Sequence, residues 1–463
     1  MSDITRLPAA ELFQRCDLAQ FEFATTSDLE GLAGIVGQDR AREAIEFGLG
    51  IDRDGYNLFV LGPAGAGKQT LLRQVLATRT GAANPPPDWC YVHNFEHPHQ
   101  PRALRLPAGR GAALRSDMRQ LLEELRAAIP AAFESDEYRA HREQLDAEYN
   151  ERQETAFAEL AGLAAGQDFA LLRTPTGFTL APVRKGEVIT PDEFAALTDE
   201  ERKRIGETMA ALQQKLEQLM HSGLRWRKEQ RARIRKLNAE VAQYAVGSLM
   251  EELKQRYAGL PEVIRHLGAV ERSLVENVDD FHHAAEASPV PPGASAVPDG
   301  TFRRYEVNLL LDHREPDGAP LVFEEHPTYQ NLVGRVEYIP QLGALVTDFT
   351  QIKAGALHRA NGGYLLLDAQ KVLTQPFAWE ALKRVLTTHT IRIESLGQMY
   401  SLVSTISLEP EPIPVNVKIV LFGERYWYHL LYALDPDFRE LFKVAVDFDD
   451  EIPRTSENQM LLA

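Results

Sequence analysis

Short, mainly apolar runs alternate with long stretches of helical spacing along this chain. The runs cover residues 57–61, 364–367 and 415–424, and each one leads into glycine or an acidic residue. Such runs are typical of strands buried on both faces of a parallel sheet. The pattern therefore predicts mixed α/β structure in residues 35–108 and again in residues 303–449.

The intervening residues 109–283 are expected to be mainly helical. Their apolar positions step by three and four residues at Leu114, Met118, Leu121 and Leu125, at Ile205, Met209, Leu212, Leu216 and Leu219, and at Ile234, Leu237, Val241 and Tyr244. This spacing places apolar side chains on one narrow stripe, as in a coiled coil or a helical hairpin. The region is either a passive spacer or an arm that contacts a partner, a substrate or a neighbouring subunit.

A break in the helical spacing predicts a small β element near residues 171–189. There the sequence LRTPTGFTLAPVRKGEVI places short apolar runs between turn residues,. Two capping boxes follow, Thr190 with Glu193 and Thr198 with Glu201, and they mark restarts of helix. The division of the chain that results is a lead-in at 1–34, α/β structure at 35–108, helices at 109–283, a flexible linker at 284–302, α/β structure at 303–449 and a final segment at 450–463.

Composition and charge narrow the class of protein. The chain has 463 residues, 44% of them hydrophobic and 25% charged, as expected for a globular protein and not for a disordered or fibrous one,. No apolar run approaches the ~18 residues of a membrane helix, and the N-terminus does not resemble a signal peptide. Only two cysteines, Cys16 and Cys90, are present, which favours a cytoplasmic location,.

A net charge of −17 argues against a protein that wraps duplex DNA, so we expect no nucleic-acid partner,. One segment departs from this balance, because RWRKEQRARIRK at 225–236 holds seven basic residues. It is interpreted either as a solvated helix face, which the surrounding spacing favours, or as a contact for an acidic partner.

The strongest chemical signal is NLFVLGPAGAGKQT at residues 57–70, a strand, a glycine-rich loop and the start of a helix. This is the context of a phosphate-binding loop, in which backbone N–H groups, the helix N-terminus and a lysine surround phosphate oxygens. The ATP-binding residues expected here are Gly62, Pro63, Ala64, Gly65, Ala66, Gly67, Lys68, Gln69 and Thr70. Gln69 stands where a Ser or Thr hydroxyl normally ligates Mg²⁺.

Two further strand ends are expected beside this loop. Asp368 ends the run YLLLD, where it can organise the hydration shell of Mg²⁺ opposite the glycine-rich loop,. Ala369 follows it, where many ATPases carry a Glu that orients the attacking water. Glu424 ends the third run and either faces the γ-phosphate or is an ordinary strand-end acid.

Arg439, in LDPDFRELFKV, is either an arginine finger toward a neighbouring subunit or a surface charge.

Several motifs together resemble Lon-like AAA+ proteases over essentially the whole chain. Ile35, Val36, Gly37 and Gln38 look like the box that precedes the phosphate loop in AAA+ ATPases. GALHRANGGYLLLD, HPTYQNLVGRVEYIP, TPTGFTLAPV and PFAWEALKR are similar to a Lon-like subgroup in which a long helical insertion splits the AAA+ module. The resemblance implies a P-loop AAA+ fold, a ring of subunits, expected to be a hexamer, and ATP bound near Ile35–Gln38 and Gly62–Lys68.

The resemblance also implies a function. Family members grip unfolded polypeptide with loops that face the pore of the ring, and Tyr338, Ile339 and Phe349 are the residues expected to do so here. A C-terminal Ser–Lys peptidase domain and a small helical lid complete the family's architecture; residues 450–463 resemble the start of that lid, and we expect the chain to be a truncated ATPase portion.

Two alternatives remain open at this stage. Gln69 and Ala369 allow a nucleotide-binding scaffold with little hydrolysis, in which the changes Gln69→Ser and Ala369→Glu would create activity. A motor that remodels nucleic acid is the third interpretation, and the negative charge of the chain weighs against it,.

Overall fold

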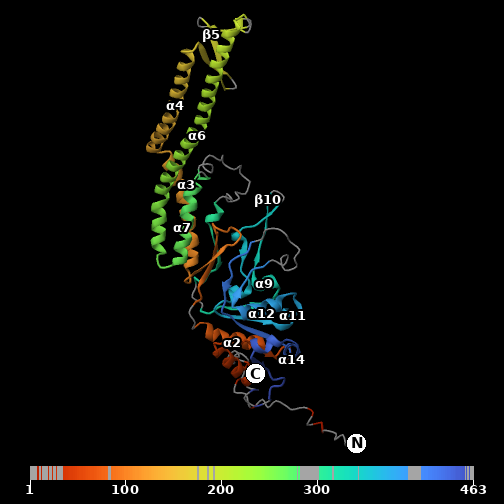
Figure 1. Ribbon diagram of the computed structural model, residues 1–463. Helices are drawn as coiled ribbons and strands as arrows, with labels where there is room; N and C mark the ends of the chain where they lie inside the picture. Colours follow the sequence, from red (N-terminus) through yellow and green to blue (C-terminus); the bar gives the residue numbers. More distant parts are fainter. Residues whose placement is uncertain are drawn as a thin grey trace. The chain divides into compact units, whose positions relative to one another are not determined.

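The computed structural model (Figure 1) describes residues 35–81, 85–174, 177–184, 187–190, 193–194, 196–278, 280–281, 302–314, 318–341, 344–394 and 408–453, with isolated positions before and after these ranges. The chain forms two compact units, one from residues 1–119 and 302–463 and the other from residues 120–301. Almost all of the predicted lead-in and residues 284–301 of the predicted linker lie outside the described residues.

The first unit is built on a five-stranded sheet in which every pair of neighbours is parallel. Its strands, in spatial order, are β17 (Val444–Asp447), β1 (Leu58–Leu61), β16 (Lys418–Gly423), β13 (Tyr364–Asp368) and β8 (Leu321–Glu324). Leu61 pairs with Gly423 and with Asp447, and Asp368 pairs with Phe422. This register brings the carboxyl ends of the four strands β17, β1, β16 and β13 to one edge of the sheet.

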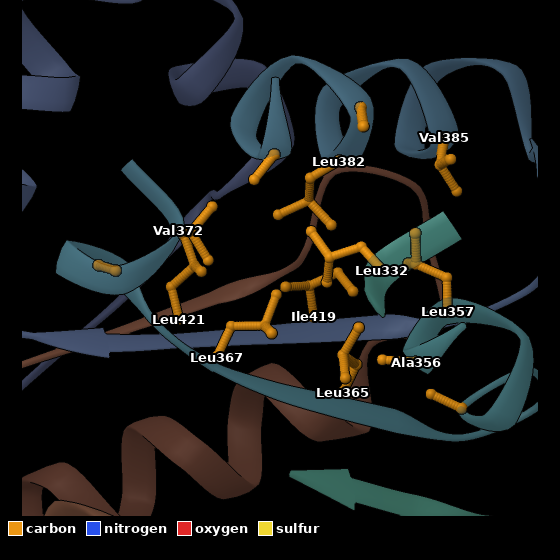
Figure 2. Close-up of a cluster of buried hydrophobic side chains, with 14 of the residues drawn as sticks. Leu332, Ala356, Leu357, Leu365, Leu367, Val372, Leu382, Val385, Ile419 and Leu421 are labelled. Carbon is orange, nitrogen blue, oxygen red and sulfur yellow. The ribbon is translucent and has the colours of Figure 1, made fainter. Parts of the chain in front are cut away.

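Helices cover both faces of this sheet because its central strands are apolar on both sides. They are α1 (Asp39–Gly50), α2 (Lys68–Thr80), α9 (Tyr329–Val333), α10 (Ala356–Arg359), α11 (Ala369–Thr374), α12 (Ala378–Thr388), α14 (Arg425–Leu434) and α15 (Pro436–Leu441). One core cluster joins α1 and α2 to Leu58, Val60 and Val420. The other cluster lies on the opposite face, where Leu382 and Val385 of α12 pack over the strands β13 and β16 (Figure 2).

Smaller sheets extend the first unit. A three-stranded antiparallel sheet has the order β3 (Arg102–Leu106), β2 (Asp88–Val92) and β7 (Val307–Leu311). Two-stranded pairs are formed by β9 (Arg335–Val336) with β12 (Ile352–Lys353), β10 (Ile339–Gln341) with β11 (Ala344–Val346), and β14 (Thr390–Ile391) with β15 (Ile413–Pro414). Single 3₁₀ turns span Arg303–Tyr305 and Phe349–Gln351. A separate core between these elements includes Trp89, Tyr91 and Phe349.

The second unit consists of long helices and a small sheet. Its elements are the end of α3 (Arg110–Phe133), α4 (Asp136–Ala165), β4 (Phe169–Thr174), β5 (Gly177–Arg184), β6 (Glu187–Val188), α6 (Asp199–Arg256) and α7 (Pro261–Glu276). Helices α4 and α6 run side by side, with β5 at one end of the pair (Figure 1). The three strands are antiparallel neighbours, so the predicted β tip is confirmed.

Helix α6 has 58 residues and is therefore about 87 Å long,. It begins at the predicted capping box, in which Glu201 N–H donates to the Thr198 hydroxyl and Thr198 N–H donates to the Glu201 carboxylate. Leu212 packs with Phe169 and Leu180, as the heptad spacing predicts. In the basic segment, Arg233 pairs with Glu148 of α4 at 3.1 Å.

The heptad prediction is wrong at Tyr244, which is 87% exposed. The buried stripe of α6 passes instead through Ala242, Val246 and Met250. The reason is that α6 packs against α7 in this part of its length, where Lys254 bonds Glu271, and a new neighbour changes which side of a helix is covered,.

The predicted fold class is confirmed: an α/β module with a parallel sheet, interrupted by a helical insertion with a small β tip. Among the helices of the described part of the chain, none combines the length and the apolar character needed to cross a membrane.

Candidate functional site

The glycine-rich loop lies between β1 and α2, at the carboxyl edge of the five-stranded sheet. Gly65 and Gly67 have φ angles of +81° and +80°, a left-handed conformation that side chains with a Cβ rarely adopt,. Gly67 is the N-cap of α2, and no side chain caps this helix. The first backbone N–H groups of α2 are therefore oriented to receive an anion.

Lys68 folds back over the loop that precedes it. Its Nζ donates hydrogen bonds to the carbonyl oxygens of Gly62 at 2.8 Å and Pro63 at 2.5 Å. Partial burial lowers the pKa of Lys68, while the nearby carboxylates of Glu424 and Asp368 act in the opposite direction. The register of the sheet thus brings together three of the residues expected at the site: Lys68 at the start of α2, Asp368 at the end of β13 and Glu424 directly after β16.

Asp368 is both the end of β13 and the N-cap of α11. Its Oδ1 accepts a hydrogen bond of 3.0 Å from the backbone N–H of Lys371. Glu424 has a similar place before α14, but its side chain makes no capping bond, and it is exposed. Both carboxylates are therefore held at the edge of the sheet by short strand-to-helix connections.

The residues present fit a nucleotide with Mg²⁺. In such sites Mg²⁺ takes one or two carboxylates, with phosphates and waters completing its octahedron. Over the described ranges no cluster of three or more His, Cys, Asp or Glu residues could hold a metal by itself, so phosphate oxygens would have to supply the remaining ligands. Gln69 and Thr70 are exposed in the first turn of α2 and offer an amide and a hydroxyl oxygen.

The side chain of Ala369 belongs to the core and is 1% exposed. It belongs to the same buried cluster as Leu367, Leu421 and Val372. A Cβ added at Gly423 would be 3.3 Å from the Cβ of Ala369. A Glu at this position in this chain would enter packed apolar side chains.

Of the residues that precede α1, Ile35 lies beside the glycine-rich loop and Gln38 bonds the turn that follows β17. Gln38 is 3% exposed; its Nε2 donates to the Asp449 carbonyl at 3.1 Å, and Asp449 N–H donates to its Oε1 at 3.0 Å. A Cβ added at Gly67 would lie 2.9 Å from Cδ1 of Ile35. Val36 is buried. These residues thus form a wall beside the loop.

Sequence reasoning missed Arg425, the first residue of α14. Its guanidinium donates to Asp447 at 2.9 Å, to Asp450 at 2.6 Å and to the carbonyl of Phe448 at 2.6 Å. These bonds raise the pKa of Arg425. The sequence did contain a signal for these contacts. GERYW follows one buried strand and DFDD follows another, and because parallel strands end at the same edge of a sheet, the arginine and the aspartates can be expected to meet,.

Arg439 is not brought to Lys68 within the chain. It is exposed on α15, where its Nε donates to the Tyr432 carbonyl at 2.9 Å and its guanidinium lies 4.2 Å from the centroid of the Tyr432 ring. Lys383 of α12 fixes this helix through Asp435 at 3.0 Å.

The expected substrate-contact residues fall into two environments. Tyr338 and Ile339, at the hairpin of β10 and β11, are 44% and 36% exposed, and Leu345 on the second strand is 72% exposed. Phe349 is only 3% exposed and packs with Trp89. Its prediction as a substrate contact is corrected, because a core side chain cannot reach a passing polypeptide.

Comparison with known proteins finds two families. Residues 317–449 match the model of the LonB-like AAA domain, and residues 88–121 match the Lon-like LonC helical domain. No curated protein matches significantly. Among solved structures, a crystal structure of NtrX from Brucella abortus is 22% identical, with a TM-score of 0.18; it covers 26% of this chain, which spans 23% of the NtrX chain. The low TM-score means that the likeness to NtrX supports no conclusion about this chain. The two family matches confirm the resemblance to the ATPase portion of Lon-like AAA+ proteases.

Proposed function

We propose that this chain, which contains a LonB-like AAA domain, is the ATP-binding module of a Lon-like ATP-dependent protease. The observation that carries the proposal is the meeting of Lys68, Asp368 and Glu424 at the edge of the sheet where the uncapped helix α2 begins. Ligands of open parallel sheets bind at this edge. The match of residues 317–449 supports the class of activity, and the site residues are our assignment.

Each residue has a distinct part in binding. The loop from Gly62 to Gly67 would surround the phosphates with backbone N–H groups, and Lys68 would exchange its bonds to loop carbonyls for phosphate oxygens,. Asp368 would hold Mg²⁺ through its hydration shell, with Gln69 or Thr70 as an additional oxygen donor. ATP with Mg²⁺ supplies the phosphoryl group that is transferred to water.

Asp368→Asn tests the assigned role of the carboxylate without removing the helix cap. Asn is as good an N-cap as Asp, so the bond from Lys371 N–H persists,. We expect ATP hydrolysis to fall about 100-fold, while binding of ATP without Mg²⁺ changes little, because a negative charge is lost from the metal side only. Parallel measurements of turnover and of calorimetric affinity check this. If the wild type hydrolyses ATP readily, unchanged turnover in the variant would exclude Asp368 from the site.

The remaining assignments concern the assembled protein. We assign residues 35–108 and 303–449 to one AAA+ module, 109–283 to the insertion, 284–302 to a linker, and 450–463 to the start of a lid. The module would form a cytoplasmic ring, a hexamer by family resemblance, with Arg439 directed to the neighbour's γ-phosphate. The ring would deliver unfolded protein to a Ser–Lys peptidase domain.

The β10–β11 hairpin is our candidate for the polypeptide contact. Tyr338, Ile339 and Leu345 expose apolar area there, and such area can hold an extended chain without reading its sequence. We expect the double change Tyr338→Ser and Leu345→Ser to weaken binding of a labelled, permanently unfolded polypeptide about tenfold, measured by fluorescence anisotropy. The control is Tyr244→Ser, which removes from α6 a tyrosine that is more exposed than Tyr338, 87% against 44%. Equal affinities for the double variant and the control would exclude the hairpin as the contact.

A second candidate function is a nucleotide-binding scaffold that hydrolyses ATP slowly. The sequence favours it, because Ala369 follows Asp368 and offers no carboxylate to orient water. Glu380, the nearest alternative in sequence, is 71% exposed and pairs with Lys383 at 3.1 Å. Tight ATP binding with turnover that Asp368→Asn does not lower further would support the scaffold.

A further inference from the structure

Three aspartates follow the strand β17 in the sequence DFDD, and we refer to residues 447–450 as the acidic turn. Asp447, Asp449 and Asp450 lie within four residues, so their like charges oppose a compact conformation,. Two arginines from other parts of the chain offset this repulsion. Arg40 of α1 approaches Asp449 at 2.8 Å and Asp447 at 3.7 Å, and Arg425 bonds Asp447 and Asp450.

The acidic turn contacts both ends of the proposed nucleotide site. At the phosphate end, Phe448 is fully buried, its N–H donates to the Leu61 carbonyl at 2.8 Å, and a Cβ at Gly62 would be 2.7 Å from the Phe448 Cβ. At the other end, Asp449 exchanges two backbone hydrogen bonds with the side chain of Gln38.

Arg425 contributes more bonds to the acidic turn than Arg40 does. Arg40 bonds only Asp449 and has a side chain that is 65% exposed, whereas Arg425 donates to two carboxylates and to the Phe448 carbonyl and is 34% exposed. A planar guanidinium can satisfy three acceptors in fixed directions, which a lysine ammonium does less well. Arg425 also directly follows Glu424, at the edge of the sheet that carries Lys68.

We propose that Arg425 is a positioning residue for nucleotide recognition: by holding the acidic turn, it fixes Gln38 and, through it, the position of Ile35 against the glycine-rich loop. The inference rests on the proposed function, since it needs a nucleotide to bind there. Ile35 is apolar and only partly buried, so it suits the nucleoside part of the ligand, while the loop and Lys68 suit its phosphates. The N–H of Phe448 bonds the Leu61 carbonyl and anchors the phosphate end of the turn without Arg425, so Arg425 is expected to affect the affinity for the nucleoside part more than the affinity for the phosphates.

Inorganic tripolyphosphate separates the two parts, because it presents the phosphates of ATP without the nucleoside. We expect Arg425→Ala to weaken ATP binding about tenfold, while tripolyphosphate affinity stays within about twofold of wild type. Arg425→Lys should recover part of the ATP affinity, because it restores the charge but not the three directed bonds. The matched control is Arg314→Ala, which removes an arginine paired with Asp312 at 2.7 Å outside the site; both affinities should stay unchanged.

The outcomes distinguish this inference from the function on which it rests. If wild-type protein binds neither ligand, the proposed function itself fails. If wild type binds both and Arg425→Ala binds ATP normally, the positioning role is wrong. Equal losses for ATP and tripolyphosphate in Arg425→Ala also overturn it, since they would mean that Arg425 acts on the phosphate loop or on folding as a whole. Retained tripolyphosphate binding by the variant shows that its loop is intact.

Discussion

Replacing Lys68 by alanine is expected to lower ATP affinity at least about 100-fold. The ammonium is partly buried, and burial lowers its pKa, but the adjacent carboxylates of Glu424 and Asp368 favour its charged form. Without Lys68, those two carboxylates would face the phosphates with no cation of the loop between them, so repulsion adds to the loss of attraction. Isothermal titration calorimetry of ATP into both proteins measures the difference.

Lys371→Ala is the matched control for this variant. Lys371 lies on α11, and its Nζ donates to the carbonyl of Glu325 at 3.1 Å, away from the loop carbonyls that Lys68 bonds. The backbone N–H that Asp368 accepts is unaffected by the change. ATP affinity should therefore stay close to wild type in Lys371→Ala. A similar loss in both variants would indicate a general effect of positive charge and would contradict a specific phosphate contact by Lys68.

Replacing Ala369 by glutamate is expected to destabilise the first unit by at least about 3 kcal/mol. The Ala369 side chain is 1% exposed among apolar neighbours, so a longer side chain overpacks the cluster and its carboxylate loses water without gaining a partner. Under the scaffold interpretation, the sequence alone suggested a gain of hydrolysis from Gln69→Ser combined with Ala369→Glu. Chemical denaturation followed by circular dichroism measures the loss of stability.

Gln370→Glu provides the comparison, because it introduces the same carboxylate one residue later at an exposed position. Its free energy of unfolding should stay within about 0.5 kcal/mol of wild type. An Ala369→Glu protein that is as stable as Gln370→Glu and hydrolyses ATP faster than wild type would show that residue 369 can reach the nucleotide. In that case the argument from the burial of Ala369 would be wrong.

The parts of the fold that could be predicted from sequence are those encoded locally. The apolar runs at 57–61 and 364–367 correspond to β1 and β13, because a strand buried on both faces can be recognised from its own sequence without knowing which strands lie beside it,. The glycine-rich loop, the Thr198–Glu201 capping box and the β tip are likewise local patterns,. Lys68 and Asp368 could be placed at one edge of a sheet because parallel strands end together.

The parts that could not be predicted depend on packing between distant segments. Tyr244 keeps the heptad spacing but lies on a part of α6 where α7 covers another side. Phe349 was expected in a loop that contacts polypeptide, yet it is buried beside Trp89, which lies on a strand about 260 residues earlier in the sequence. Arg425 acquires its role only because β17 adds to the sheet next to β1, which brings the acidic turn within reach of α14.

An equilibrium titration of ATP into the wild-type chain, with and without Mg²⁺, tests the central claim most directly. The account predicts saturable binding of one nucleotide per chain that Mg²⁺ strengthens, since Asp368 and phosphate oxygens would share the ion. Folded protein that shows no saturable heat at millimolar ATP under either condition would contradict it, and the edge of the sheet that carries Lys68, Asp368 and Glu424 would then not be a nucleotide site.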